Sequence, residues 1–485
     1  MNLTRRGILA GLLAGTVSPA FGGAVTTSLR PRARLQGGGA APLGDTSALV
    51  EAARLGGATG YVVAEAATGR VLEAVNAELP LPPASVTKAI TALYALERLG
   101  AGYRFATRVM AVGPISGGRL NGDLVLVGGG DPTLDSDKLG DLVADLARTG
   151  LRQVTGRLIV HAGALPSFDR IAEDQPVQVG YNPGLSGLSL NFNRVNFEWT
   201  KGGAATQMNA RGERFVPLVR MARMAVVERQ SPLYAYRKGQ GTEDWSVARG
   251  GLGKAGSRWL PVRQVAPYVA EVFQTLCAAQ GIKLPAPQMV QAMPAGARVL
   301  VARQSEDLSV ILRQMLRFST NITAETVGLT ASGARSLDGS AAMVAAWART
   351  RLGLEARLVD HSGLGAGSRV TAGGMMRALV AGDRALGLRP ILRNIGLRDD
   401  QGKPVKGHPT TVVGKSGTLN FVSGLAGFIE PRSGRDLVFA IFSADAARRQ
   451  ALAMAEREDP PGGDAWVKRA HLLLARLIRR WAGMV

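Results

Sequence analysis

The sequence is poor in the side chains that usually carry metal or thiol chemistry. Its 485 residues include one cysteine and four histidines, at positions 161, 361, 408 and 471. A single cysteine cannot form a disulfide within the chain, and the histidines lack the close spacing of zinc ligands. We therefore expect no metal site, and we look for the chemistry among serine, lysine, aspartate, glutamate and asparagine.

Acidic and aromatic residues are also scarce. The chain has 37 acidic against 58 basic residues, which gives a net charge of +21, and only 5% of its residues are aromatic. A basic surface suits a polyanion such as nucleic acid, anionic lipid or a carboxylate-rich wall polymer, but an arginine-rich proteome gives the same balance. The few aromatic residues argue against stacking platforms for single-stranded nucleic acid.

No long apolar run opens the chain. Residues 8–17 are apolar but too few to span a bilayer as a helix, and they follow Arg5-Arg6 and precede small residues. This is the order of an export signal, so we predict a signal peptide over 1–24. The paired arginines resemble a twin-arginine signal, and an ordinary secretion signal is the alternative. Residues 25–45, rich in Gly, Pro, Ala and Arg, are predicted to be a flexible linker.

Apolar patterning places two halves of one domain on either side of an insertion. The first half, 46–104, begins with a strand-like hairpin at 60–64 and 70–74 and continues with helical spacing over 86–99. The second half, 296–485, has helical patterns at 307–318, 324–331, 341–352 and 375–386, and then strand-like runs at 411–419, 425–430 and 436–442. Helices before and after an antiparallel sheet predict an α+β fold.

A last helix is predicted over residues 466–481. Its apolar residues fall on one face of the helix. We expect this face to pack against the predicted sheet, with membrane anchoring as the alternative.

The intervening residues 105–295 have a different sequence pattern. Short strand-like pieces at 124–127, 157–160 and 195–199 are joined by turns rich in glycine and proline, and few long helices are evident. We predict a β-rich inserted domain, or more than one such domain, over these residues.

Ser85-Val86-Thr87-Lys88 is the first candidate for catalysis. Residues three apart share one face of a helix, so the Lys88 amine can lie beside the Ser85 hydroxyl. A serine hydroxyl is a weak nucleophile until a base takes its proton, and a partly desolvated lysine can have a pKa low enough to do so. The start of a helix adds N–H groups and positive potential for an oxyanion. Taken alone, the same pattern also fits an ordinary surface helix.

Ser319-Thr320-Asn321 is the second candidate, between two helical patterns. Ser319 could relay a proton, and the Asn321 amide could hold a substrate carbonyl. The alternative is a helix N-cap, where serine and asparagine are favoured.

Lys415-Ser416-Gly417-Thr418 is the third candidate and lies within a strand-like run. Ser416 and Thr418 point to the same side of a strand, and Gly417 lets a ligand backbone approach as an added strand. The alternative is an edge strand protected by a lysine.

The three patterns stand in the order Ser-x-x-Lys, Ser-x-Asn, Lys-Ser-Gly, which resembles that of serine penicillin-recognising enzymes. Ser319 follows Ser85 by 234 positions (319 − 85), and the insertion accounts for this distance. Nearly the whole mature chain resembles the class C low-molecular-mass penicillin-binding proteins, the D-alanyl-D-alanine carboxypeptidase/endopeptidase family of the penicillin-binding protein 4 type. Residues 122–134 and the loop 360–364 add to the resemblance, although the loop continues as Gly365-Ala366 where many relatives have Ser-Arg.

The resemblance implies a β-lactamase/transpeptidase-like domain interrupted by the β-rich insertion. It implies a serine D-Ala-D-Ala carboxypeptidase or endopeptidase that acts on peptidoglycan stem peptides and cross-links in the periplasm. It implies that the enzyme needs no cofactor and that β-lactam antibiotics inhibit it. From the predicted export signal and the few aromatic residues we expect no nucleic-acid partner, and from the short apolar stretch we expect no stable membrane span.

The resemblance also implies a role for each motif residue. Ser85 would attack the D-Ala-D-Ala carbonyl with Lys88 as its base, Ser319 and Lys415 would pass the proton to the leaving D-alanine, and Asn321 would orient the substrate. Lys415, Ser416 and Thr418, around Gly417, would bind the terminal carboxylate. The N–H groups of Ser85 and Thr418 would form the oxyanion hole.

Three alternatives remain open from the sequence. A β-lactamase or esterase would share the chemistry but would deacylate fast. A non-catalytic wall-binding protein would carry the motifs as relics, and their intactness argues against it. A nucleic-acid binder rests on charge alone, and the predicted export signal argues against it.

Overall fold

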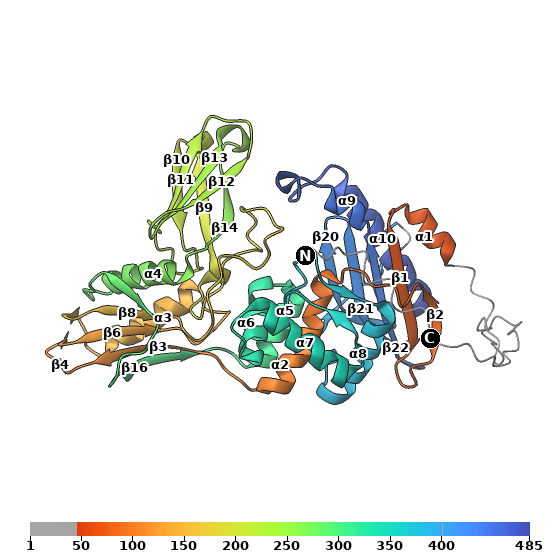
Figure 1. Ribbon diagram of the computed structural model, residues 1–485, viewed down its shortest axis with the longest axis horizontal. Coiled ribbons are helices and arrows are strands. Elements are labelled where there is room, and N and C mark those ends of the chain that lie inside the picture. Colours follow the sequence, from red (N-terminus) through yellow and green to blue (C-terminus); the bar gives the residue numbers. More distant parts are fainter. Residues whose placement is uncertain (1–45, 400) are drawn as a thin grey trace, which may run out of the picture. The chain divides into compact units, whose positions relative to one another are not determined.

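The computed structural model describes residues 46–399 and 401–485 (Figure 1). The predicted signal peptide, 1–24, and the predicted linker, 25–45, lie outside the described residues. Within the described part of the chain, no helix is both long and apolar enough to cross a membrane.

A six-stranded antiparallel sheet joins the two ends of the described chain. The strand order is β19-β20-β21-β22-β1-β2, and β1 pairs with β22, so the amino-terminal hairpin completes the carboxy-terminal sheet. The predicted hairpin and the three predicted carboxy-terminal strands are confirmed. The strands are β1 (Ala58–Glu65), β2 (Val71–Val75), β19 (Arg393–Asn394), β20 (Thr411–Leu419), β21 (Val422–Glu430) and β22 (Leu437–Ala444).

Successive residues of a strand point to opposite faces of a sheet, and here both sets are apolar. Both faces must therefore be covered, and helices cover them. On one face, α1 (Ser47–Ala53) and α10 (Gly463–Ala482) pack on it (Figure 1), with Trp481 of α10 against Tyr61 and Phe439. The prediction that the last helix packs against the sheet is therefore confirmed. The short α9 (Ala446–Gln450) follows β22.

The other face carries the helices that hold two of the three motifs. They are α2 (Thr87–Leu99), α5 (Leu308–Phe318), α6 (Asn321–Ser332), α7 (Leu337–Leu352) and α8 (Ala372–Leu386), which confirm the helices predicted there. A two-stranded ribbon of β17 (Ala356–Arg357) and β18 (Arg369–Val370) lies between α7 and α8 in the chain.

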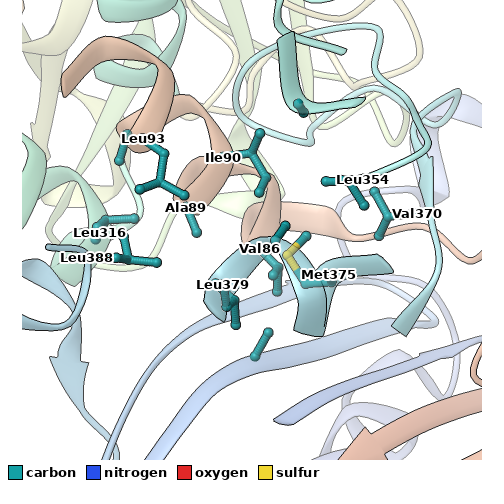
Figure 2. Close-up of a cluster of buried hydrophobic side chains, with 14 of the residues drawn as sticks. Val86, Ala89, Ile90, Leu93, Leu316, Leu354, Val370, Met375, Leu379 and Leu388 are labelled. Atoms are coloured by element: carbon teal, nitrogen blue, oxygen red, sulfur yellow. The ribbon is translucent and has the colours of Figure 1, made fainter. Parts of the chain in front are cut away.

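The start of α2 is embedded in an apolar core. Figure 2 shows Val86, Ala89, Ile90 and Leu93 among buried side chains from other segments: Leu316, Leu354, Val370, Met375, Leu379 and Leu388. Burying one such aliphatic side chain contributes about 1.5–3 kcal/mol. The turn that carries Ser85 therefore stands on a rigid, well-packed base.

The segment between α2 and α5 forms separate sheets. The largest has the order β15-β8-β6-β3-β16, and two three-stranded sheets have the orders β10-β9-β14 and β11-β13-β12. The strands are β3 (Ala106–Val112), β6 (Asp123–Val127), β8 (Leu158–His161), β9 (Arg194–Thr200), β10 (Ala205–Asn209), β11 (Ala222–Val227), β12 (Tyr234–Lys238), β13 (Glu243–Ala248), β14 (Gly256–Pro261), β15 (Pro287–Val290) and β16 (Arg298–Gln304). A fourth, small sheet contains β4 (Ile115–Ser116), β5 (Arg119–Leu120) and β7 (Gln153–Val154).

The sequence pattern of this segment did not predict two of its helices. They are α3 (Ser136–Arg148), of 13 residues, and α4 (Val265–Ala279), of 15 residues. The side chain of Asp135 accepts a hydrogen bond from the Lys138 N–H and so caps α3. The predicted domain bounds stay a prediction. The strand after residue 295, β16, pairs with β3, the first strand after α2.

Candidate active site

Ser85 lies in a 3-10 turn, Ala84–Val86, that leads directly into α2. Ala84 has a φ of +45°, a left-handed conformation that is costly for a residue with a side chain. Strand β20 presses on this turn through a glycine, since a Cβ on Gly417 would lie 2.7 Å from the Ser85 backbone nitrogen. The structure therefore brings the first and third motifs into backbone contact.

Lys88 reaches back from α2 to Ser85. Its Nζ donates to the Ser85 Oγ at 2.8 Å, to the Asn321 Oδ1 at 2.8 Å and to the Ser362 backbone oxygen at 2.8 Å. These contacts use every proton of an ammonium group. Lys88 has a relative exposure of 0%, so the alternative of an ordinary surface pair does not fit the structure.

Burial makes Lys88 a usable base. Loss of solvation lowers the pKa of Lys88 to about 7, and the nearby Glu325 and Asp360 oppose that shift. A lysine with such a pKa is partly neutral at neutral pH and can accept the Ser85 proton.

Ser319 and Lys415 form a second serine–lysine pair. Lys415 Nζ, from β20, donates to the Ser319 Oγ at 2.9 Å and to the Ser416 backbone oxygen at 2.5 Å. Burial lowers the pKa of Lys415 well below its usual value, and the positive charges of Lys88 and Arg393 lower it further. The Lys415 side chain is buried, so the alternative of an edge strand protected by an exposed lysine does not fit the structure.

Ser319 sits where two helices meet. It ends α5 with a left-handed φ of +60°, and the side chain of Thr320, at the start of α6, makes no capping hydrogen bond. The N-cap alternative therefore does not describe Ser319. The strained backbone instead turns the Ser319 hydroxyl toward Lys415.

Asn321 is held at both ends of its amide. Its Oδ1 accepts from Lys88, and its Nδ2 donates to the backbone oxygen of Tyr181 at 2.9 Å. Tyr181 belongs to the segment between β8 and β9, so the inserted part of the chain contacts the second motif directly. One proton of the Asn321 amide remains for a substrate.

Ser416 and Thr418 lie on one side of β20, as the period of a strand requires. The Ser416 Oγ accepts from the Arg393 Nη2 at 2.8 Å, and the Thr418 Oγ1 lies 3.2 Å from the His471 Nε2. Neither Arg393 nor His471 was singled out from the sequence. Both are distant in the chain, and no local pattern marks them.

Two buried carboxylates below Lys88 were also missed as site residues. The Glu325 side chain accepts from the backbone N–H of His361 at 3.0 Å and of Ser362 at 2.9 Å. Asp360 accepts from the N–H groups of Gly363 at 2.5 Å and Gly365 at 2.6 Å. Together they clamp the loop whose carbonyl, at Ser362, accepts from Lys88.

Burial raises the pKa of Glu325, and the neighbouring Asp360 raises it further. Burial also raises the pKa of Asp360. One signal could have identified Glu325: it lies one helical turn after Asn321 and is the only charged residue of α6, and a fully buried glutamate is rare without a partner.

No three or more histidine, cysteine, aspartate or glutamate side chains are grouped to hold a metal ion in residues 46–399 and 401–485. The arrangement instead offers two serine hydroxyls, each bonded to a buried lysine, and a glycine-lined strand. These are the parts needed for acyl transfer through a serine.

Comparisons with known proteins agree on one family. Residues 44–460 match the D-Ala-D-Ala carboxypeptidase 3 (S13) family. The chain is 26% identical over 457 residues to a carboxypeptidase of Mycobacterium tuberculosis, covering 86% of this chain and 85% of that protein. It is 28% identical over 435 residues to the D-alanyl-D-alanine carboxypeptidase of an Actinomadura strain, covering 82% of this chain and 80% of that protein.

A solved structure agrees with the fold. Penicillin-binding protein 4 of Haemophilus influenzae is similar with a TM-score of 0.72 and 18% identity, covering 90% of this chain and 99% of that one. The α+β fold predicted from the sequence, a transpeptidase-like domain with a β-rich insertion, is confirmed. The matched family likewise confirms the predicted resemblance and enzyme class. The chain thus belongs to the D-Ala-D-Ala carboxypeptidase 3 (S13) family, and it is a serine-type D-Ala-D-Ala carboxypeptidase.

Proposed function

We propose that Ser85 is the nucleophile and that the reaction runs through a Ser85 acyl-enzyme. The observation that carries this proposal is the 2.8 Å contact between the Ser85 Oγ and a fully buried Lys88 amine of lowered pKa. Neutral Lys88 takes the hydroxyl proton as the Ser85 oxygen attacks the carbonyl of the penultimate D-alanine. The new C–O bond leaves a tetrahedral oxyanion.

The oxyanion is stabilised by the backbone N–H groups of Ser85 and Thr418. Ser85 stands at the amino end of α2, where unpaired N–H groups and the helix dipole add positive potential. Close approach of β20 at Gly417 supports the pairing of these two N–H groups at one oxygen.

The C–N bond then breaks, and the leaving amine needs a proton. Ser319 donates its hydroxyl proton and takes one from Lys415, whose amine lies 2.9 Å away. The D-alanine departs, and Ser85 holds the remaining peptide as an ester. Before the second step Lys88 releases the proton it took from Ser85, and Lys415 regains one, so that the net exchange with solvent is zero. Water then attacks the ester while neutral Lys88 takes its proton. Lys88 returns that proton to the departing Ser85 oxygen, which releases the shortened peptide and restores Ser85.

The substrate is held along β20 and at Asn321. Lys415, Ser416 and Thr418 bind the terminal carboxylate, Gly417 lets the peptide backbone approach, and Asn321 orients the penultimate residue. Substrates are peptidoglycan stem peptides and, for endopeptidase action, their cross-links. A β-lactam acylates Ser85 in place of the peptide.

We also propose that the enzyme works in the periplasm. Support comes from the arginine pair and the short apolar stretch of residues 1–24, which has the order of a twin-arginine signal. The basic surface suits a carboxylate-rich wall.

Labelling with fluorescent penicillin tests the nucleophile. The mature wild-type protein is expected to form a covalent adduct, and Ser85→Ala is expected to form none. Equal labelling of both proteins, or of neither, would remove Ser85 from this role. An adduct that turns over within seconds would favour the β-lactamase alternative, and digestion of cross-linked peptides would separate endopeptidase from carboxypeptidase action.

A further inference from the structure

A cavity of about 700 Å³ opens beside the third motif, on the side of β20 that faces α10. Ser416 and Thr418 form part of its wall, so it adjoins the place where the proposed function puts the terminal carboxylate. Its size lies in the range that accepts a drug-sized ligand and exceeds the needs of one alanine side chain.

The cavity is strongly cationic. Arg393, Arg398, Lys468 and His471 line it, and its described lining contains no acidic residue. We call these four residues and the space between them the cationic pocket. A pocket of one charge sign attracts ligands of the other.

The three permanent cations of this pocket lack acidic partners. Arg393, Arg398 and Lys468 form no ion pair with a carboxylate of residues 46–399 or 401–485. The Arg393 Nε is buried and has no hydrogen-bond partner in the same range. A buried donor without a partner is costly, and a bound carboxylate would satisfy it.

The cationic pocket lies close to the reacting bond. Gly417, between the two wall residues Ser416 and Thr418, touches the backbone of Ser85. A peptide whose carbonyl is at Ser85 and whose terminal carboxylate is at Ser416 therefore directs its leaving residue toward the pocket.

Building on the proposed function, we propose that the cationic pocket is a leaving-group subsite that favours a leaving group with a second carboxylate. The first carboxylate binds at Ser416 and Thr418, and the second pairs with Arg398 and Lys468. Two sources supply this chemistry: an acidic terminal residue in place of D-alanine, or a cross-linked stem peptide that carries further carboxylates.

His471 is a positioning residue in this scheme. Partial burial, Arg398 and Arg393 all lower the pKa of His471, which favours the neutral form of its ring. If its Nε2–H donates to the Thr418 Oγ1, 3.2 Å away, the Thr418 hydroxyl keeps its own proton for the substrate carboxylate.

The test compares leaving groups on one acyl peptide. The value of kcat/KM is measured for peptides that end in D-Ala-D-Ala or D-Ala-D-Glu, and for a cross-linked dimer. Arg398→Gln and Lys468→Gln are each expected to lower the D-Glu to D-Ala ratio by about fivefold, the upper value for a partly exposed charge pair. The double variant is expected to lower it further, by at most about 25-fold, the product of the two single effects.

Arg476→Gln is the matched control. Arg476 lies on α10, as Lys468 does, but it lines a separate cavity with Arg479 and Arg480. Saturating fluorescent penicillin counts the active sites in each preparation, so that misfolded protein does not affect the ratio.

Each outcome decides the matter. A fall of the D-Glu ratio alone assigns the second carboxylate to the terminal residue, and a selective loss of dimer cleavage assigns it to the cross-linked peptide. Ratios within twofold of the wild type for both leaving groups, or an equal fall in Arg476→Gln, would overturn the subsite while Ser85 chemistry stands. A wild type that neither hydrolyses a peptide nor binds penicillin would overturn the proposed function, and the subsite with it.

Discussion

Lys88 and Lys415 are two buried lysines with the same kind of partner and different electrostatic surroundings. Each Nζ lies within 2.9 Å of a serine hydroxyl, on Ser85 and Ser319 respectively. Lys88 faces the carboxylates Glu325 and Asp360, whereas the charges that act on Lys415 are those of Lys88 and Arg393, both positive.

These different surroundings suit the two lysines to different tasks in the reaction. Carboxylates hold the pKa of Lys88 near neutrality against full burial, which suits a base that must take and return a proton at the working pH. Lys415, with cations around it, has a pKa well below the usual lysine value until an anion arrives. The carboxylate of a substrate is such an anion, so binding and protonation of Lys415 support each other.

Of the replacements considered, that of Lys88 should have the largest effect on the acylation rate. In Lys88→Met the Ser85 hydroxyl loses its base, and we expect penicillin acylation to slow by about 10³-fold, within the range for general-base catalysis. Stopped-flow labelling measures this rate. The exposed Lys254→Met is the control and should label at the wild-type rate. Acylation of Lys88→Met within tenfold of the wild type would assign the base elsewhere.

Replacement of Lys415 should cost less and should depend on the substrate. We expect Lys415→Met to lose about 10²-fold in kcat/KM on a peptide with a free terminal carboxylate, since it loses both a proton relay and a cation. On the same peptide with an amidated terminus the loss should be smaller. An equal loss on both peptides would show that Lys415 does not recognise the carboxylate.

The two lysines also show what a sequence can predict. Lys88 stands three residues after Ser85 on one helix, so a local pattern is enough to place it, and Lys415 is visible as a charge within an apolar strand. The strands and helices around them follow from apolar periodicity, which burial on both faces of the sheet reinforces.

The residues that shift the pKa values of Lys88 and Lys415 could not be predicted in this way. Glu325 and Asp360 reach Lys88 from α6 and from a loop, and Arg393 reaches Ser416 from a two-residue strand. Their roles depend on long-range packing, which no local spacing records. Helices α3 and α4 were missed for another reason: the glycine- and proline-rich turns around them dominate the composition of the inserted segment.

Replacement of Glu325 tests whether this side chain raises the pKa of Lys88. The Glu325 carboxylate raises the pKa of Lys88, so Glu325→Gln should lower that pKa and move the acidic limb of the kcat/KM profile to lower pH. Its amide keeps one acceptor oxygen but turns an NH2 group toward one of the two N–H donors, of His361 or of Ser362, which should cost about 1–3 kcal/mol of unfolding free energy. The exposed Glu355→Gln serves as control for both measurements. A limb that stays in place, with stability lost, would give Glu325 a purely structural role.

Replacement of Arg393 should give the smallest change. Because its positive charge lowers the pKa of Lys415, Arg393→Gln should raise that pKa. If Lys415 must be protonated to supply the leaving amine, the alkaline limb of the kcat/KM profile then moves to higher pH. Loss of the bond from Arg393 to the Ser416 hydroxyl should at the same time raise KM by roughly threefold to tenfold, in keeping with the roughly 1 kcal/mol worth of one hydrogen bond. Arg476→Gln, with the same loss of charge on α10, should leave both quantities unchanged. A limb that moves to lower pH in Arg393→Gln would mean that the cations around Lys415 do not govern its protonation, and the contrast with Lys88 would then rest on Glu325 and Asp360 alone.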